Sequence, residues 1–284
     1  MWRPVSHLRS NDIVSIALVA FGALILPLLG WYTLGPVSLI IGPIISLFLI
    51  LVALAEVYRS SQETAKEIVQ IYPQLAALMS VLSCLKITHP IPPLRGWAAG
   101  PDFISLCISA ILAHKPQNVI ECGSGASTVL MCYGLKQVGS GRIWSLEHDE
   151  NFARTTKEHL AAHGLEEQGQ VIHAPLQQVS INGKSWRWYD ISIFDRVAPI
   201  DLLVVDGPPG NVGPKMRYPA LPLLYPLLSP EATIIVDDAR REDEEEMIND
   251  WLAEFKDFTW EPRQTETGAM ILRRRANVSA PPKG

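Results

Sequence analysis

The chain has 284 residues, of which 48% are hydrophobic, and a formal net charge of −5. This negative balance lacks the basic footprint of a nucleic-acid-binding protein, so we expect no nucleic acid as a partner. The four cysteines show neither paired metal-ligand spacing nor the framework of an extracellular disulfide-rich domain.

The N-terminal region predicts a membrane anchor. No charged residue occurs between Asp12 and Glu56. As one helix this stretch would be about 65 Å long, which is too long for a single crossing of a ~30 Å hydrocarbon core. Because glycine and proline occur in its middle, we expect two transmembrane helices, near Ile13–Tyr32 and Val37–Val57, joined by a short turn.

The charges around these spans predict their orientation. Arg3 and Arg9 precede the first span, Arg59 and Lys66 follow the second, and the connecting turn carries no cation. By the positive-inside rule, both termini and the C-terminal domain lie in the cytoplasm. A cleaved secretory signal is the alternative, but a second apolar span directly after the first argues against cleavage.

A linker follows the anchor. Between residues 58 and 87, leucine and isoleucine recur at steps of three and four, which predicts an amphipathic helix with a kink or split at Pro73. The next segment, His89–Gly100, is rich in proline and is not regular helix. Its Trp97 is a candidate lid over a ligand site or, alternatively, a buried residue that packs the linker.

The most informative stretch, residues 117–130, reads QNVIECGSGASTVL. A short apolar strand ends on Glu121, a glycine turn with Gly123 and Gly125 follows, and small residues then open a helix. Glycines allow a sharp turn and close approach to a ligand, and a helix start presents free N–H groups. We therefore expect this turn to hold a cofactor, although a plain strand–helix connection is the alternative.

The turn discriminates between cofactors. A phosphate-binding loop needs a lysine that is absent here. A dinucleotide fingerprint needs a third glycine where the chain has Thr128, so NAD is disfavoured but stays an alternative. The acid two residues before the first glycine would repel a pyrophosphate and suits a cation, such as the amino group of a methionine-derived ligand.

Further strands with acidic ends follow in order. Arg142–Glu147 is a predicted strand whose final acid lies about 20 residues past the turn, where a nucleoside-binding unit places a carboxylate for the ribose hydroxyls. A helix over Asn151–His163 and a third strand over Gln170–Ala174 come next. The apolar run Leu202–Val205 predicts a strand buried on both faces of a parallel sheet.

The last predicted strands complete the sheet. The strand Leu202–Val205 ends on Asp206, and Glu231–Asp238 ends on two carboxylates. Phe258–Gln264 and Ala269–Arg273 are predicted to form a closing antiparallel pair. Since ligands bind at the carboxyl ends of strands in open α/β sheets, we expect these polar ends to line one crevice.

This succession resembles the class I S-adenosylmethionine-dependent methyltransferases, whose first motif is Glu/Asp-x-Gly-x-Gly, over about Pro90 to Arg275. The resemblance implies an α/β fold: a Rossmann-like seven-stranded, mostly parallel sheet with one antiparallel strand and helices on both faces, here preceded by two transmembrane helices. It also implies S-adenosylmethionine as the cofactor. The implied cofactor-binding residues are Glu121, Gly123, Gly125, Ser127, Glu147, His148, Ala174 and Asp206.

The same resemblance implies the catalytic groups. Methyl transfer needs the proton of the acceptor removed or masked, and Asp206 lies at the fourth-motif position, as a general base or metal ligand. Together with Asp237 and Asp238 it offers oxygen ligands suited to Mg²⁺. This arrangement resembles the metal-dependent catechol-type O-methyltransferases but departs from their Asp-Asn pair. A helix-capping role for Asp237 or Asp238 is the alternative.

The cations Lys215 and Arg217 follow the Gly-Pro-Pro-Gly loop and are predicted either to bind an acidic acceptor or to lie solvated in the loop.

The predicted domains are an anchor (1–57), a linker and lid segment (58–100), a methyltransferase domain (101–275) and a disordered tail (276–284). The predicted function is membrane-anchored O-methylation of a small-molecule, glycan or lipid-linked acceptor. The alternatives are a non-catalytic membrane scaffold of the same fold and an NAD-dependent oxidoreductase.

Overall fold

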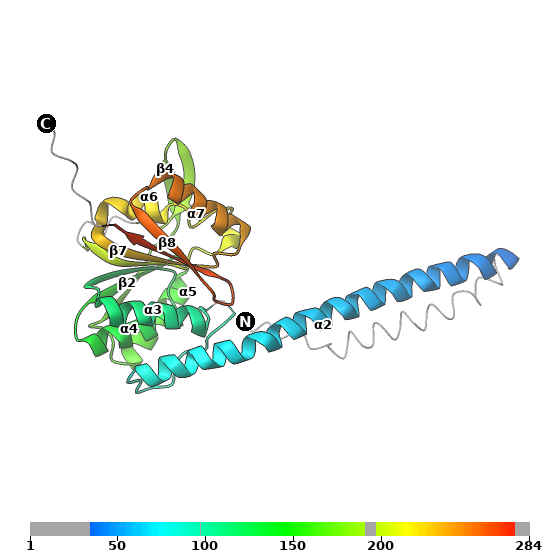
Figure 1. Cartoon of the computed structure of the whole chain (residues 1–284), viewed down its shortest axis with the longest axis horizontal. Coiled ribbons are helices and arrows are strands. Elements are labelled where there is room, and N and C mark those ends of the chain that lie inside the picture. The colour runs from blue at the N-terminus through cyan, green and yellow to red at the C-terminus, as the bar shows by residue number, and fades with distance from the viewer. Residues whose placement is uncertain (1–34, 97, 191–196, 276–284) are drawn as a thin grey trace. The chain divides into compact units, whose positions relative to one another are not determined.

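The computed structural model describes residues 35–96, 98–190 and 197–275. The chain divides into two compact units, Met1–Pro73 and Gln74–Gly284 (Figure 1). Three predicted features lie outside the described residues: the span Ile13–Tyr32, the candidate lid Trp97 and the tail from residue 276.

One long helix, α2 (Ser38–Cys84), follows a short 3-10 turn, η1 (Gly35–Val37). The helix α2 continues through Pro73 and is not split there into two helices. A proline removes one backbone hydrogen bond, and the turns beyond it are held by burial of Gln74 and Val81 in the second unit.

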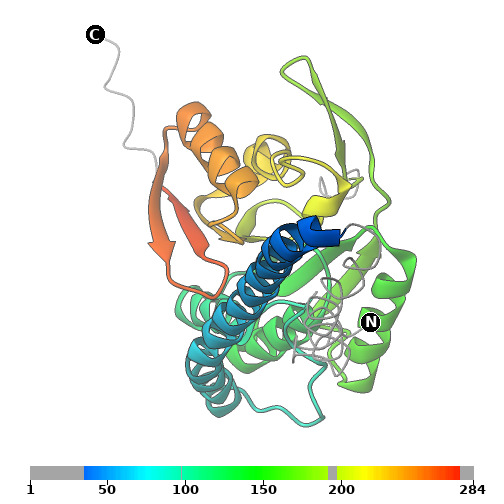
Figure 2. The same cartoon turned by 90° about the vertical axis from the view of Figure 1, so that its right-hand side faces the viewer.

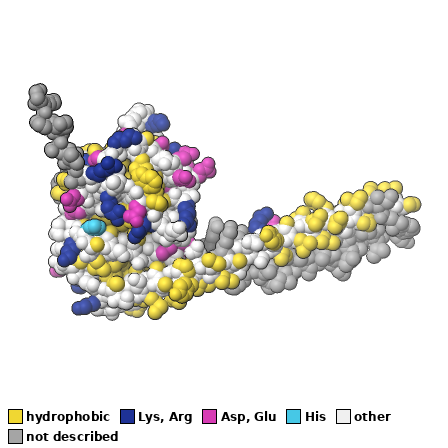
Figure 3. All heavy atoms as spheres, in the orientation of Figure 1, with side chains coloured by type: hydrophobic (Ala, Val, Ile, Leu, Met, Phe, Trp, Pro, Cys, Tyr) yellow, Lys and Arg dark blue, Asp and Glu magenta, His cyan; other side chains and the backbone are white. Residues whose placement is uncertain are grey.

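Part of α2 has the length and composition of a membrane span. Among the described residues, Pro43–Gln62 is the one such stretch, and the other predicted span, Ile13–Tyr32, lies outside these residues. Pro43–Gln62 overlaps the predicted span Val37–Val57 and extends further along the helix. Figure 3 shows hydrophobic side chains along α2, and the exposed ones include Ile44, Phe48 and Leu54.

The second unit is built on a seven-stranded sheet in the order β3-β2-β1-β6-β7-β9-β8. The strands β1, β2, β3, β6 and β7 run parallel, and β9 runs antiparallel to both of its neighbours. This confirms the predicted mostly parallel sheet with one reversed strand. The strands are β1 (Asn118–Cys122), β2 (Arg142–Glu147), β3 (Gly169–His173), β6 (Ile200–Val205), β7 (Leu228–Asp237), β8 (Phe258–Arg263) and β9 (Ala269–Arg274).

Helices cover both faces of this sheet, as predicted (Figure 1). Alternate residues along each strand face opposite sides. Val119 therefore packs in the apolar cluster of α3, α4 and α5, whereas Ile120 packs in the cluster of α6 and α7. The helices are α3 (Pro101–His114), α4 (Ala126–Val138), α5 (Glu150–Ala162), α6 (Ala220–Leu224) and α7 (Glu242–Glu254), with 3-10 turns η3 (Gly210–Val212) and η4 (Tyr225–Leu227).

A second, two-stranded sheet was not predicted. The strands β4 (Gln177–Ile181) and β5 (Lys184–Trp188) form an antiparallel hairpin. Figure 2 shows it in yellow-green, extending away from the main sheet. Its two-residue turn is Asn182-Gly183, and both residues have positive φ. Asn-Gly is the strongest short-range hairpin signal, so the sequence did contain the information needed to predict this hairpin.

Candidate active site

The strand register gathers most of the predicted site residues at one edge of the sheet. Cys122, the last residue of β1, pairs with Leu146 of β2 and with Val205 of β6. Val205 in turn pairs with Val236 of β7. The residues that follow these four positions therefore lie side by side at the carboxyl edge. They are Gly123, Glu147, Asp206 and Asp237.

The glycine turn between β1 and α4 packs closely against the loop after β6. Gly123 has φ +94°, and a Cβ on Gly207 would lie 3.1 Å from the Gly123 backbone N and Cα. At Gly125, by contrast, a Cβ would meet nothing within 4 Å, so this backbone faces open space. The helix α4 begins directly after it, at Ala126. An open glycine beside a helix N-terminus suits close approach by a polar ligand.

Glu121 lies beneath this turn and is fully buried. One carboxylate oxygen accepts a hydrogen bond from Ser127 Oγ at 2.5 Å, and the other accepts one from Thr128 Oγ1 at 2.6 Å. Burial raises the pKa of Glu121 to about 7, although the hydrogen bonds from Ser127, Ser145 and Thr128 act to lower it. The structure therefore pairs two predicted cofactor contacts, Glu121 and Ser127, with each other.

Glu147 joins the loop after β2 to the glycine turn. Its side chain is nearly buried, and its oxygens accept hydrogen bonds from the backbone N–H of Ser124 and of Asp149, both at 3.0 Å. His148 lies beside it, with Nδ1 2.9 Å from Glu147 Oε1. Ala174, after β3, donates its backbone N–H to the carbonyl of Glu147 at 2.7 Å. Glu147, His148 and Ala174 thus form one group next to the turn.

Asp206, Asp237 and Asp238 form a second group at this edge. One carboxylate oxygen from each lies within 4.8 Å of the others. Burial raises the pKa of Asp206 well above its usual range, with Arg217 opposing the shift. Burial, with repulsion from Asp238, raises the pKa of Asp237 to about 6. Three oxygen donors at this spacing are chemically suited to Mg²⁺.

An arginine lies among these acids, however. Nη2 of Arg217 lies 2.8 Å from Asp238 Oδ2 and 3.3 Å from Asp206 Oδ1, and Nη1 donates to the carbonyl of Asp237 at 3.0 Å. The Arg217 side chain is only 3% exposed. The protein therefore supplies its own cation to the three aspartates, and the residues present do not fit a resident divalent metal.

Arg217 and Lys215 were predicted as cations for an acceptor. The structure buries Arg217 within the aspartates, and it pairs Lys215 with Glu246 at 2.7 Å and with Asp250 at 3.1 Å. No sequence period marks the loop that carries Arg217, so its place among the aspartates could not be inferred from spacing. Glu244, the buried acid of α7, lies 3.7 Å from Arg217 Nε and completes the group.

Tyr189 is a site residue that the sequence did not reveal. It follows the unpredicted hairpin, and its side chain is fully buried. Its hydroxyl has no hydrogen-bond partner among the described residues, and it would lie 2.5 Å from a Cβ on Gly207. Burial raises the pKa of this hydroxyl well above its usual range. Its ring meets that of His148 at a centroid distance of 6.4 Å.

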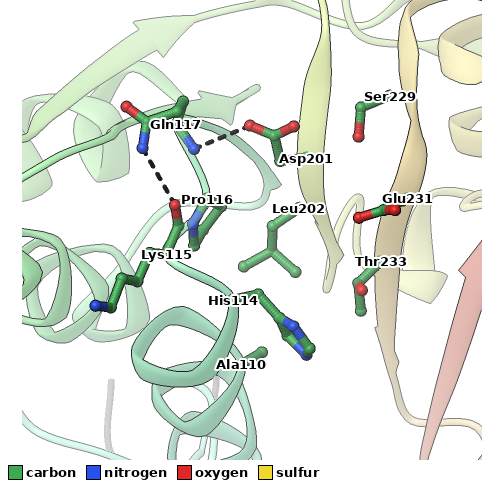
Figure 4. A pocket seen from close by; sticks show the side chains of 10 residues that line it. All are labelled: Ala110, His114, Lys115, Pro116, Gln117, Asp201, Leu202, Ser229, Glu231 and Thr233. Atoms are coloured by element: carbon green, nitrogen blue, oxygen red, sulfur yellow. Dashed lines mark hydrogen bonds between the residues drawn. The ribbon is translucent and has the colours of Figure 1, made fainter.

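A surface hollow of about 250 Å³ lies at the opposite edge of the sheet (Figure 4). It is formed by the end of α3 and the amino-terminal parts of β6 and β7. Within it, Asp201 accepts hydrogen bonds from the backbone N–H of Gln117 and of Asn118, which ties the start of β1 to β6. None of the predicted site residues lines this hollow. It is separate from the site at the carboxyl edge.

The family comparison concerns the part of the chain that forms the carboxyl edge. Residues 120–239, which include the glycine turn, Glu121, Glu147, Asp206, Asp237 and Asp238, match the family model of a methyltransferase domain. Over this stretch the protein is similar to a methyltransferase domain, and the match covers less than half of the chain.

Other comparisons give more distant likenesses. No curated protein matches the chain. A solved methyltransferase from Geobacter sulfurreducens is 16% identical, with a TM-score of 0.47, and the match covers 72% of this chain and 88% of that one. The O-methyltransferase TomG from Streptomyces achromogenes, in complex with SAM, is 16% identical, with a TM-score of 0.48 and coverage of 71% and 89%. At these identities and TM-scores the likenesses carry no argument about the acceptor.

Proposed function

We propose that this enzyme transfers the methyl group of S-adenosylmethionine to an oxygen of its acceptor, with the cofactor bound across the turn Gly123–Gly125. The observation that carries the proposal is the position of Glu147. Its carboxylate lies directly beside the turn, hydrogen-bonded to the backbone N–H of Ser124. A carboxylate there suits the hydroxyls of a ribose.

The remaining cofactor contacts follow from this placement. The open backbone at Gly125 and the start of α4 offer room and N–H groups to the methionine end. His148 and Ala174 border the adenine of the cofactor. Glu121 and Ser127 act from beneath, because their mutual hydrogen bond holds the first turn of α4 in position. These roles are proposals that accord with the contacts of each side chain.

Asp206 is the proposed catalytic residue. When bound, S-adenosylmethionine supplies an electrophilic methyl group. The acceptor hydroxyl loses its proton to the Asp206 carboxylate as its oxygen forms the new bond to carbon, and the electron pair of the broken C–S bond stays on sulfur. The Asp206 side chain is 22% exposed and therefore within reach of a substrate.

The acceptor is proposed to be a small molecule, a glycan or a lipid-linked compound near a membrane. The support is the candidate span Pro43–Gln62. Together with the predicted span Ile13–Tyr32 it would form a hairpin anchor, with both termini and the catalytic domain on the cytoplasmic side. The cations Arg59 and Lys66 after the second span favour this orientation.

The test uses Asp206→Asn in the full chain. We expect this variant to bind S-adenosylhomocysteine as the wild type does, by calorimetry, and to lose 10²- to 10⁴-fold in transfer of labelled methyl to an acceptor in membrane extracts. Glu245→Gln, at an exposed acid of α7, is the matched control and should keep full activity.

Two results would contradict the proposal. Binding of NAD⁺ but not of S-adenosylhomocysteine would favour the oxidoreductase. Methyl transfer at an unchanged rate by Asp206→Asn would remove Asp206 from the chemistry. A cellular role that survives this substitution in full would favour the scaffold.

A further inference from the structure

The guanidinium of Arg217 joins the ends of two neighbouring strands. Through Nη2 it binds Asp206, after β6, and Asp238, after β7, and through Nη1 it binds the carbonyl of Asp237. A divalent metal held by the same acids would lie beside this positive charge. The planar fork of an arginine presents several donors in a fixed geometry, so one side chain can satisfy several acceptors at once.

Each of the three aspartates already has one oxygen engaged by a proton donor. Asp206 Oδ1 accepts from Arg217. Asp237 Oδ1 accepts from the backbone N–H of Asp238 and from Thr267 Oγ1. Asp238 Oδ2 accepts from Arg217 and lies 2.7 Å from Nη1 of Arg241. A metal bound by the remaining oxygens would be repelled by the positive charge of the Arg217 guanidinium.

The loop around Arg217 is held independently of the aspartates. The Tyr218 carbonyl accepts a hydrogen bond from Trp251 Nε1 at 2.9 Å, and the Tyr218 ring stacks on Trp186 at a centroid distance of 4.6 Å. On the other side, Lys215 is paired with two acids of α7. The backbone therefore presents Arg217 to the aspartates from an anchored position, rather than from a free loop that a metal could easily push aside.

We propose that Arg217 is the resident cation of this site and stands where a divalent metal would otherwise bind. The guanidinium offsets the charge of the aspartate group, holds Asp206 by one oxygen, and leaves the enzyme without a divalent metal in this cluster. Arg217 is therefore a positioning residue for Asp206. That last point rests on the proposed function, whereas the exclusion of metal does not.

The experiment measures Mn²⁺ binding to the full chain by calorimetry and by electron paramagnetic resonance. Wild type should show no saturable binding. Arg217→Gln removes the cation and should bind one Mn²⁺ per chain, with a rise in its thermal unfolding midpoint when Mn²⁺ is added. Adding Asp206→Asn to that variant should abolish the binding. Arg217→Lys, the matched control that keeps a cation, should bind no Mn²⁺.

Saturable Mn²⁺ binding by wild type that Asp206→Asn removes would overturn the inference. So would a folded Arg217→Gln protein that binds no Mn²⁺, because the site would then not be a latent metal site. If Arg217→Gln fails to fold, the wild-type and Arg217→Lys measurements still decide. None of these measurements uses cofactor or acceptor, so failure of the proposed methyl transfer would leave their outcome unchanged.

Discussion

The carboxylates at the two halves of the sheet edge are stabilised in different ways. At β1 and β2, Glu121 and Glu147 accept hydrogen bonds from hydroxyls and from backbone N–H groups. At β6 and β7, Asp206 and Asp238 share the guanidinium of Arg217. The same sequence feature, a strand that ends on an acid, thus leads to a neutral set of donors on one side and to a buried ion pair on the other. The one buried cation on the second side, among the described residues, is Arg217, whereas Arg241 pairs with Asp238 from an exposed position.

The largest expected effect is the loss of Arg217. Arg217→Gln leaves the buried aspartates without their cation and should lower the free energy of unfolding by about 3–5 kcal/mol. Arg241→Gln removes a second partner of Asp238, but Arg241 is 54% exposed, so about 1 kcal/mol or less is expected. Denaturant unfolding of both variants checks the contrast. Equal losses would show that burial does not distinguish the two arginines.

The second effect concerns pH on the other side of the edge. The pKa of Glu121 is about 7 in the folded protein against 4.5 as its ordinary value. Between these values the folded state keeps a proton that the unfolded state has lost, so raising the pH through this window lowers the free energy of unfolding. The full difference corresponds to about 3 kcal/mol.

Glu121→Gln cannot titrate, so its free energy of unfolding should fall less than that of wild type between pH 4.5 and 7. The raised pKa values of Asp206 and Asp237 act in the same direction in both proteins, and the shift at Asp206 should be smaller in the variant because the charge of Glu121 contributes to it. Denaturant unfolding at several pH values measures the difference. Parallel curves for the two proteins would refute the role of this carboxylate.

The smallest expected effect sharpens the role of Glu147. Glu147→Gln keeps the shape of the side chain but removes the charge offered to the proposed ribose. Hydrogen bonds to charged groups contribute about 1.5–3 kcal/mol, so this variant should bind S-adenosylhomocysteine about 10- to 100-fold more weakly. Glu150→Gln, three residues later and exposed, is the control. Calorimetry compares the two. Equal affinities would place the ribose elsewhere.

Much of the fold could be predicted from the sequence because buried parallel strands are short, continuous apolar runs. The run Leu202–Val205 is apolar throughout and became part of the buried strand β6. Strand alternation could also have placed Glu121, since it shares a face with Val119, which packs under α3 and α4. The first turn of α4 supplies the hydroxyls that Glu121 meets, so its burial beneath the turn was readable in principle.

Other features depend on tertiary contacts that no local pattern encodes. The loop that carries Arg217 has no period, and its path is set by contacts of Tyr218 with Trp186 and Trp251 from two distant segments. The sequence alone therefore predicted a metal at the acidic strand ends. The strand ends can be located from local patterns, whereas the position of the cation, Arg217, depends on contacts between distant segments. The hairpin β4–β5, in contrast to the Arg217 loop, has a local sequence signal, the turn Asn182-Gly183, although it was not predicted.

The close packing of Gly207 against Gly123 restricts what the loop after β6 can carry. This loop and the turn after β1 meet backbone to backbone, and a Cβ at Gly207 would lie 3.1 Å from the Gly123 backbone and 2.5 Å from the Tyr189 hydroxyl. Any larger residue at Gly207 would therefore have to displace the Tyr189 side chain and move the two backbones apart.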